Sequence, residues 1–289
     1  MEPKTLDGGA GVGTLLKAAL PALPGVGRLP GVRKNPKEDP RKLSYRREVA
    51  VDRGHVEKYA AVCGFPVKDN VPLPYPHMLA FPLHMAIMTD PGFPFPAIGT
   101  VHLENSITGL RPIGVDETLT VTTRVANPRK HAKGPTLDFV TEVVSGDEPV
   151  WRSTSTYLRL GKGSADAGSG TAFQDVPPSG TVWKLPGDLG RRYAAVSGDY
   201  NPIHLYPLTA KALGFKRQIA HGMWTKARCI AQLENRLPDA VTVEVAFKKP
   251  VFLPSTVAFG SRPAGEGFEF SLTSPKSGAP HLLGRTLKP

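Results

Sequence analysis

Alternation of apolar and polar residues predicts antiparallel strands in two separate parts of the chain. Residues 101–110 (VHLENSITGL) and 136–144 (TLDFVTEVV) show this alternation in the first part. Residues 241–248 (VTVEVAFK) and 268–273 (FEFSLT) show it in the second. Successive side chains of a strand point to opposite faces, so this pattern indicates sheets with one buried face.

A helical pattern precedes the strands in each part. Residues 222–235 (GMWTKARCIAQLEN) place most of their apolar side chains on one helical face. Residues 81–88 (FPLHMAIM) are short and almost wholly apolar, which predicts a buried helix. A third short helix is expected over residues 14–20, ended by Pro21. One long helix followed by antiparallel strands, twice, predicts an α+β fold in which each sheet wraps its own helix.

The two parts also share sequence, which indicates an internal repeat. Residues 59–64 (YAAVCG) and 193–198 (YAAVSG) agree at five of six positions, 134 residues apart. A strand, a basic-Pro-aliphatic turn and a second strand then recur at 111–121 and 249–259, an offset of 138 residues. Such a repeat predicts two copies of one supersecondary unit.

Composition divides the chain into four segments. Residues 1–44 are rich in Gly, Pro and basic side chains and are expected to form an N-terminal arm. The Gly- and Ser-rich stretch at 161–172 has linker composition. We therefore predict a first repeat at 45–160, a linker at 161–178 and a second repeat at 179–289.

Charge and cysteine content narrow the classes of partner. The net charge of +11 favours anionic partners, but no nucleic-acid-binding motif is present, so we expect no nucleic acid. No run of about 18 apolar residues occurs, which predicts that the chain does not insert into membranes. Cys63 and Cys229 are expected to be free buried thiols, and the chain is expected to be cytoplasmic.

The second repeat carries chemistry that the first has lost. Asp199 and His204 flank Asn201 and Pro202, and Pro202 predicts a loop that can aim a carboxylate and an imidazole at one water molecule. Gly222 opens the predicted helix, where an unpaired backbone N–H can stabilise a developing oxyanion. The first repeat has Phe65 where Asp199 stands, so it cannot supply this pair.

This constellation resembles the MaoC-like, or hydratase 2, family of hot-dog-fold (R)-specific enoyl-CoA hydratases. The family signature of an aromatic residue, S-G-D-x-N-P-aliphatic-H and a small residue matches Tyr193, residues 197–204 and Ala210 without departure. The I-A-H-G start of the helix, at residues 219–222, also matches. The resemblance implies a double hot-dog fold, with Asp199 and His204 as the catalytic pair.

The resemblance also implies roles for neighbouring residues. It makes the Gly222 N–H the oxyanion donor and Asn201 a support of the catalytic pair. Substrate contacts are expected from Ser197, His221, Met223, Lys248 and Lys249. The two lysines would contact CoA phosphates. The alternative for His221 is a packing or capping role. No metal-ligand spacing is present, and the chemistry needs neither metal nor cofactor beyond the thioester carrier.

The implied activity is the (R)-specific hydration of trans-2-enoyl-CoA to (3R)-3-hydroxyacyl-CoA, or the reverse dehydration, in fatty-acid metabolism. Three alternatives stay open. They are a dehydratase that acts on acyl carrier protein (ACP), a hot-dog thioesterase and a non-catalytic acyl-thioester-binding module. The expected partners are an acyl-CoA and, alternatively, ACP. The expected assembly is a monomeric pseudo-dimer or a homodimer.

Overall fold

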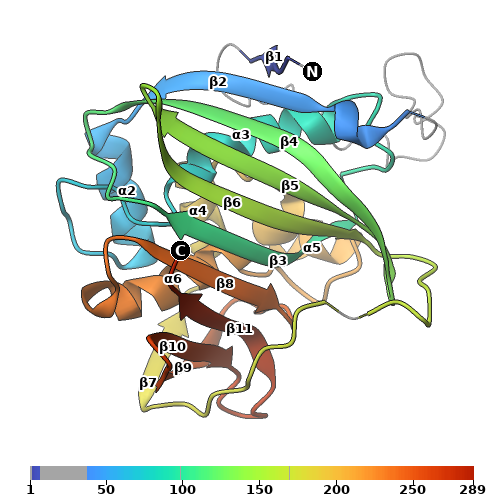
Figure 1. Ribbon diagram of the computed structural model, residues 1–289. Helices are drawn as coiled ribbons and strands as arrows, with labels where there is room; N and C mark the ends of the chain where they lie inside the picture. The colour runs from blue at the N-terminus through green and yellow to red at the C-terminus, as the bar shows by residue number, and fades with distance from the viewer. Residues whose placement is uncertain (1, 7–37, 98, 169) are drawn as a thin grey trace. The chain divides into compact units, whose positions relative to one another are not determined.

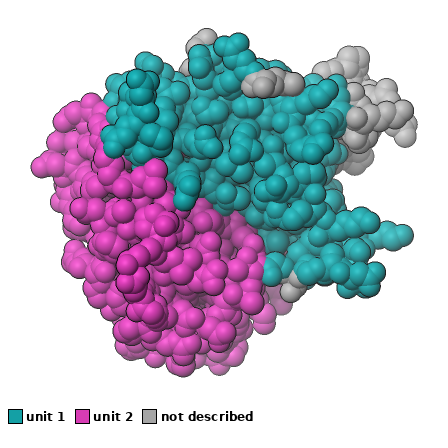
Figure 2. Space-filling model, viewed as in Figure 1, with its two compact units in different colours: residues 1–50, 77–103, 118–170 teal, residues 51–76, 104–117, 171–289 magenta. Residues whose placement is uncertain are grey.

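The computed structural model describes residues 2–6, 38–97, 99–168 and 170–289. They form two compact units (Figure 2). Unit 1 comprises residues 1–50, 77–103 and 118–170, and unit 2 comprises residues 51–76, 104–117 and 171–289. These units are defined by compactness and interleave along the chain. They do not test the boundaries at 45–160, 161–178 and 179–289, which stay predictions.

Unit 1 is built around a mainly antiparallel sheet. Its strands follow the order β1-β2-β4-β5-β6, in which β1 runs parallel to β2 and the others pair antiparallel. The strands are β1 (Lys4–Thr5), β2 (Ser44–Ala50), β4 (Thr118–His131), β5 (Gly134–Ser145) and β6 (Glu148–Arg159). A 3₁₀ turn, η3 (Pro40–Lys42), leads into β2. The strand predicted at 136–144 is confirmed as β5, while most of the arm, with the helix predicted at 14–20, lies outside the described residues.

One long helix, α3 (Pro76–Thr89), lies behind this sheet (Figure 1). The prediction of a buried helix is confirmed, but its bounds at 81–88 were wrong. Pro76 is compatible with the first helical turn, where its missing N–H has no intrahelical acceptor. Pro82 lies within the helix, where packing outweighs the lost hydrogen bond. The apolar core that joins helix and strands contains Leu43, Ile87, Met88, Phe93, Phe95, Val125, Leu137, Phe139 and Tyr157.

The core of unit 1 also contains a neutral histidine. His84 is fully buried on α3, and its ring nitrogens lie 3.1 Å from the Tyr157 hydroxyl and 3.3 Å from Thr141 Oγ1. Burial lowers the pKa of His84 well below its ordinary value. The two hydroxyl groups therefore satisfy an uncharged imidazole in this core.

Unit 2 contains the other sheet segment and the remaining helices. Strand β3 (Thr100–Gly109) enters this unit at residue 104, and the order continues β3-β8-β11-β10-β9-β7 with antiparallel pairing. The other strands are β7 (Thr181–Leu185), β8 (Val241–Phe247), β9 (Ser255–Ala264), β10 (Gly267–Thr273) and β11 (Pro280–Leu287). The strands predicted at 101–110, 241–248 and 268–273 are thus confirmed.

The helices of unit 2 include the predicted one. The helix expected over 222–235 is α6 (Gly222–Leu233), which ends in the 3₁₀ turn η5 (Glu234–Arg236). The others are α2 (Arg53–Cys63), α4 (Leu189–Ser197), η4 (Pro202–His204) and α5 (Pro207–Ala212). None of the described helices is long and apolar enough to cross a membrane.

The repeated hexapeptides form the ends of two matching helices, α2 and α4. Gly64 and Gly198 end them in the left-handed region, with φ of 79° and 72°, which glycine adopts without steric cost. Each glycine N–H donates to the residue four positions earlier, at 2.7 Å and 2.9 Å. The ring centroids of Tyr59 and Tyr193 lie 6.3 Å apart. The repeat therefore preserves a helix end and a packing contact, and the residue after the glycine is where the copies diverge.

The described residues of the region predicted to be a linker have no regular secondary structure, and its later part packs within unit 2. Val176 is buried, and its N–H donates to Ser271 Oγ at 2.8 Å. Cys63 and Cys229 are both free and buried, as predicted.

Candidate active site

The end of helix α4 positions Asp199. The left-handed turn at Gly198 ends the helix, and the Asp199 N–H donates to Ser197 Oγ at 3.2 Å. Asp199 Oδ1 accepts from the Asn201 N–H at 3.1 Å, while the side chain stays 27% exposed. One carboxylate oxygen is thus held by the loop, and the group remains accessible to a ligand.

His204 follows on the 3₁₀ turn η4, and its tautomer can be inferred from its contacts. Its Nδ1 lies 2.8 Å from the Ile219 carbonyl oxygen. A carbonyl only accepts, so Nδ1 carries the hydrogen and Nε2 keeps a lone pair. Burial lowers the pKa of His204, although the nearby Asp199 charge and the hydrogen bond to Ile219 oppose this shift. His204 is therefore a neutral imidazole with a basic Nε2.

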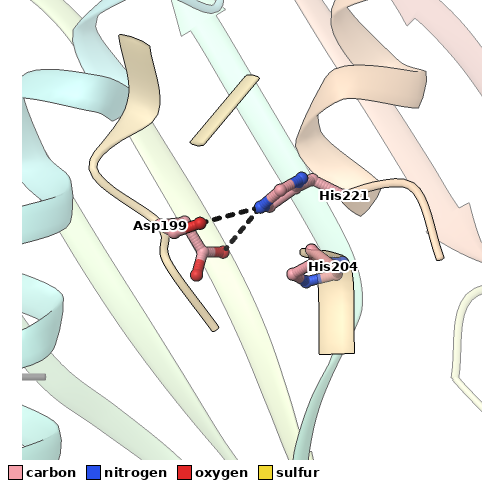
Figure 3. Close-up of side chains that lie close together, drawn as sticks. All are labelled: Asp199, His204 and His221. Carbon is pink, nitrogen blue, oxygen red and sulfur yellow. Dashed lines mark hydrogen bonds and ion pairs between the residues drawn. The ribbon is translucent and has the colours of Figure 1, made fainter. Parts of the chain in front are cut away.

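His221 lies against both catalytic candidates (Figure 3). Its ring stacks on His204 with centroids 3.7 Å apart and planes at 25°. Its Nε2 donates to the Asp199 carbonyl at 2.9 Å and lies 3.8 Å from Asp199 Oδ2. Burial lowers the pKa of His221 well below its ordinary value, and the adjacent His204 lowers it further. A neutral His221 thus links the Asp199 backbone to the His204 ring.

Helix α6 begins immediately after His221. The N–H of Gly222 is among the first four of this helix, which have no intrahelical acceptor. A Cβ at Gly222 would approach the Phe247 ring to 3.1 Å, so glycine allows the close approach of strand β8. Lys248 and Lys249 follow Phe247 and are exposed. The two lysines therefore directly follow the residue that packs against the start of α6, and they are accessible to an anion.

A buried lysine attaches α6 to the sheet of unit 2. Lys226 is fully buried, and its Nζ donates to Asn105 Oδ1 at 2.6 Å and to the Val243 carbonyl at 2.8 Å. These acceptors belong to β3 and β8, so one side chain joins the helix to two strands. Sequence reasoning missed this contact, because a lone lysine in a helical pattern predicts a solvent-exposed position.

The expected supporting residues have local structural contacts. Asn201 Oδ1 accepts from the Ile203 N–H at 3.4 Å and caps η4, while its expected support of the catalytic pair stays a prediction. Ser197 is buried beneath the loop and holds the Asp199 N–H. Met223 is buried on α6. Substrate contacts by Ser197, His221, Met223, Lys248 and Lys249 stay predictions.

A histidine from the degenerate repeat also reaches this region, and sequence reasoning missed it. His55 on α2 places Nε2 2.9 Å from the Val196 carbonyl and Nδ1 2.8 Å from the Tyr75 hydroxyl. The carbonyl fixes the hydrogen on Nε2, so Nδ1 accepts from Tyr75. His55 and Val196 are 141 residues apart, and no local pattern predicts this contact.

Asp199, His204 and His221 also form a group that could hold a cation, with one ligand atom from each within 4.8 Å of the others. Two of the ring nitrogens, His204 Nδ1 and His221 Nε2, already donate to backbone carbonyls. Only one nitrogen of each ring is therefore available as a ligand. The expectation that the chemistry needs no metal stays a prediction.

Comparison with known proteins places the chain in a family. Residues 183–265 match the model of the MaoC like domain. The chain is 39% identical over 276 residues to 3-hydroxyacyl-thioester dehydratase X of Mycobacterium tuberculosis, which covers 94% of this chain and 96% of that protein. The HtdX crystal structure from the same organism has a TM-score of 0.76 and 38% identity, over 85% of this chain and 100% of that one.

A further solved structure from Mycobacterium tuberculosis is described as having a double hotdog fold. It matches with a TM-score of 0.54 and 13% identity, over 83% of this chain and 93% of that one. At this identity the likeness concerns the fold alone, and it agrees with the α+β double hot-dog prediction. The chain therefore belongs to the MaoC-like family and has its double hot-dog fold.

Proposed function

We propose that this chain is a hydro-lyase that interconverts a trans-2-enoyl thioester and a (3R)-3-hydroxyacyl thioester, with CoA as the carrier. The observation that carries the proposal is the convergence of Asp199 and His204 beside the start of helix α6 (Figure 3). The similarity to 3-hydroxyacyl-thioester dehydratase X supports a thioester substrate. The proposal also includes the (R) configuration of the product and CoA as the carrier, both of which the family signature implies.

In this proposal the Gly222 N–H activates the substrate. It would donate to the thioester carbonyl, and the positive end of the α6 dipole would favour the charge that develops on that oxygen. Polarising the carbonyl makes the β-carbon of the enoyl group electrophilic. The Lys226 contacts would hold α6 in the position that this role requires.

Asp199 and His204 would hold one water molecule above the β-carbon. The pair takes up one proton from the water as its oxygen attacks and returns one proton to the α-carbon in the same syn step, so the pair ends with the number of protons with which it began. Nε2 of neutral His204 is an available base. Because the two groups interact closely, the proton inventory is assigned to the pair rather than to either residue. Dehydration runs through the same steps in reverse.

His221 serves this mechanism as a positioning residue. Its hydrogen bond to the Asp199 carbonyl fixes the loop backbone, and its stacked ring limits rotation of the His204 imidazole. Effective general acid–base catalysis depends on such alignment, since small displacements of a reacting group lower the rate strongly. His55 is hydrogen-bonded to Val196 in the last turn of α4, so it would support the loop that follows this helix.

A second candidate function also has support, and it differs in the carrier of the acyl group. Exposed Lys248 and Lys249 and the net charge of +11 would suit the phosphates of CoA, and equally an acidic carrier protein. We expect activity with crotonyl-CoA to exceed that with crotonyl-ACP. A preference for ACP that falls steeply with added salt would instead favour the carrier-protein dehydratase.

The decisive test is hydration of crotonyl-CoA and of a long-chain trans-2-enoyl-CoA, followed by the loss of enoyl-thioester absorbance, with product chirality determined. We expect an (R) product from the native chain and a loss of several orders of magnitude in kcat for Asp199→Asn and His204→Gln, with unchanged folding. Near-normal hydration by Asp199→Asn would overturn the mechanism. Release of free CoA thiol would instead identify a thioesterase, and substrate binding without turnover a binding module.

A further inference from the structure

A cleft in unit 2 lies apart from the residues of the catalytic loop. It has a volume of about 310 Å³ and is formed by strand β7, helices α4 and α6, and the end of α2. Its lining combines apolar side chains, two indoles and three cationic groups; the residues are Val62, Val182, Trp183, Lys184, Leu185, Pro186, Leu189, Arg192, Trp224 and Arg228. Neither Asp199 nor His204 is among them. A volume of this size accommodates a small organic molecule.

The cationic groups of this cleft lack acidic partners. No carboxylate is among the lining residues, and Lys184, Arg192 and Arg228 form no ion pair with a described residue. Asp188, which begins α4, makes no side-chain hydrogen bond to them in the described part of the chain. Three uncompensated positive charges around one concave surface produce a local potential that attracts anions.

Arg228 is fixed in place before any ligand binds. Its guanidinium lies 4.6 Å from the centroid of the Trp183 ring, and that indole also stacks with Phe259 at a centroid distance of 5.5 Å. One N–H donates to the Gly64 carbonyl at 3.3 Å. Burial lowers the pKa of this half-buried guanidinium, as expected where no carboxylate lies beside it. Its other N–H groups are available for a ligand, with little rotamer entropy left to lose.

We propose that this cleft is a second binding site, specific for an organic phosphate. The phosphate would bind between Arg228, Arg192 and Lys184, because guanidinium groups match phosphate oxygens in charge and geometry. An apolar substituent of the ligand would lie against Val182, Leu185 and Leu189. Trp183 already contacts Arg228 and Phe259, so the proposed recognition rests on charge and on apolar contact.

Ligand binding in the cleft would affect the active site through two helices that border both. Arg192 is on α4, whose end positions Asp199, and Trp224 is on α6, two residues after Gly222. The Trp224 indole N–H also donates to the Val62 carbonyl at 3.0 Å, which joins α6 to α2 beside the cleft. The phosphate has two possible sources, a phosphate of CoA itself or a separate phosphorylated metabolite; the first source rests on the function proposed above.

Calorimetric titration of the full chain with hexyl phosphate tests the proposal. We expect one site with a Kd below about 1 mM. Hexanoate and inorganic phosphate are expected to bind more weakly, because each lacks half of the recognition. Arg228→Gln and Arg192→Gln are each expected to weaken binding about tenfold. Arg192 is exposed, so its variant keeps the test valid even if Arg228→Gln folds poorly.

Arg236→Gln is the matched control. Arg236 also lies over an aromatic ring, that of Phe268 at 4.8 Å, and also donates one side-chain hydrogen bond, to Ser261 Oγ. It lies outside the cleft, so its variant removes the same charge and should leave affinity almost unchanged. Absence of hexyl phosphate binding would overturn the proposal, as would equal loss in the Arg236 and Arg192 variants, which would indicate a general charge effect.

Competition by coenzyme A then distinguishes the two sources. Displacement of hexyl phosphate in the Asp199→Asn protein would show that the cleft takes a phosphate of the carrier. Binding of both without competition would indicate a separate organic phosphate. Because Asp199→Asn abolishes turnover without touching the cleft, failure of the proposed reaction leaves this binding test intact.

Discussion

Replacement of His221 by two different residues tests whether it positions the catalytic pair. His221→Phe keeps an aromatic ring over His204 but removes the donor to the Asp199 carbonyl, a bond of 2.9 Å. Loss of one hydrogen bond of this kind should lower the free energy of unfolding by about 1 kcal/mol. The loop, however, would lose the hydrogen bond that holds the Asp199 backbone near His204. We expect kcat to fall roughly tenfold to hundredfold, with KM nearly unchanged.

The matched variant is His221→Gln, whose amide N–H can donate to the same carbonyl but whose side chain cannot stack. If the hydrogen bond is what positions Asp199, this variant should recover most of the kcat lost in His221→Phe. Steady-state hydration of crotonyl-CoA gives kcat and KM separately, and thermal denaturation gives the stability of each variant. Native kcat in His221→Phe would refute the reasoning. Equal impairment of both variants would show that the stacked ring matters as much as the donor.

Three further predictions follow from the same geometry. Gly222→Ala should lower kcat about hundredfold, because its Cβ would press on the Phe247 ring and shift the oxyanion donor; an unchanged kcat would exclude that role. Chelation with EDTA should leave activity unchanged, and a loss reversed by added Zn²⁺ would make the Asp199, His204 and His221 group a metal site. Burial lowers the pKa of His84 and His221 well below 6.5, so the unfolded chain binds more protons in acid. The free energy of unfolding should then fall below about pH 6.5, by up to 1.4 kcal/mol per pH unit for each histidine; urea unfolding in that range measures the slope, which His84→Gln should reduce.

Strands and the long helices were predictable because their signals are local. The alternation at 241–248 and the apolar pattern at 222–235 are both visible in neighbouring residues, and both elements formed as predicted, although each is buried along most of its length. Helix α3 was predicted too short, mainly at its start: it begins at Pro76, and tertiary packing sustains it through Pro82. Helices α2 and α4 were not predicted as helices, since the shared hexapeptide was interpreted as a motif rather than as a helix end.

The site could be predicted only as far as its residues are near one another in sequence. Asp199, Asn201 and His204 share one loop, whose spacing alone indicates convergence. His221 joins them through a long-range arrangement. Ile219, two residues earlier in the chain, pairs with Phe252. The contacts of His55 with Val196 and of Lys226 with Asn105 span even more of the chain. No periodicity in the sequence encodes these pairings, because each depends on tertiary packing.

The duplicated helix end gives the first copy a structural role without the Asp199 carboxylate. Both copies end a helix with a left-handed glycine, and their tyrosines pack together. Phe65 then stacks on Tyr59 at a centroid distance of 6.4 Å, where the second copy has Asp199. The first copy thus exchanges a carboxylate for apolar packing and contributes His55 to the last turn of α4. The substitution Phe65→Asp would remove this packing without supplying an imidazole like that of His204 in the second copy. It should therefore destabilise the chain and add no activity.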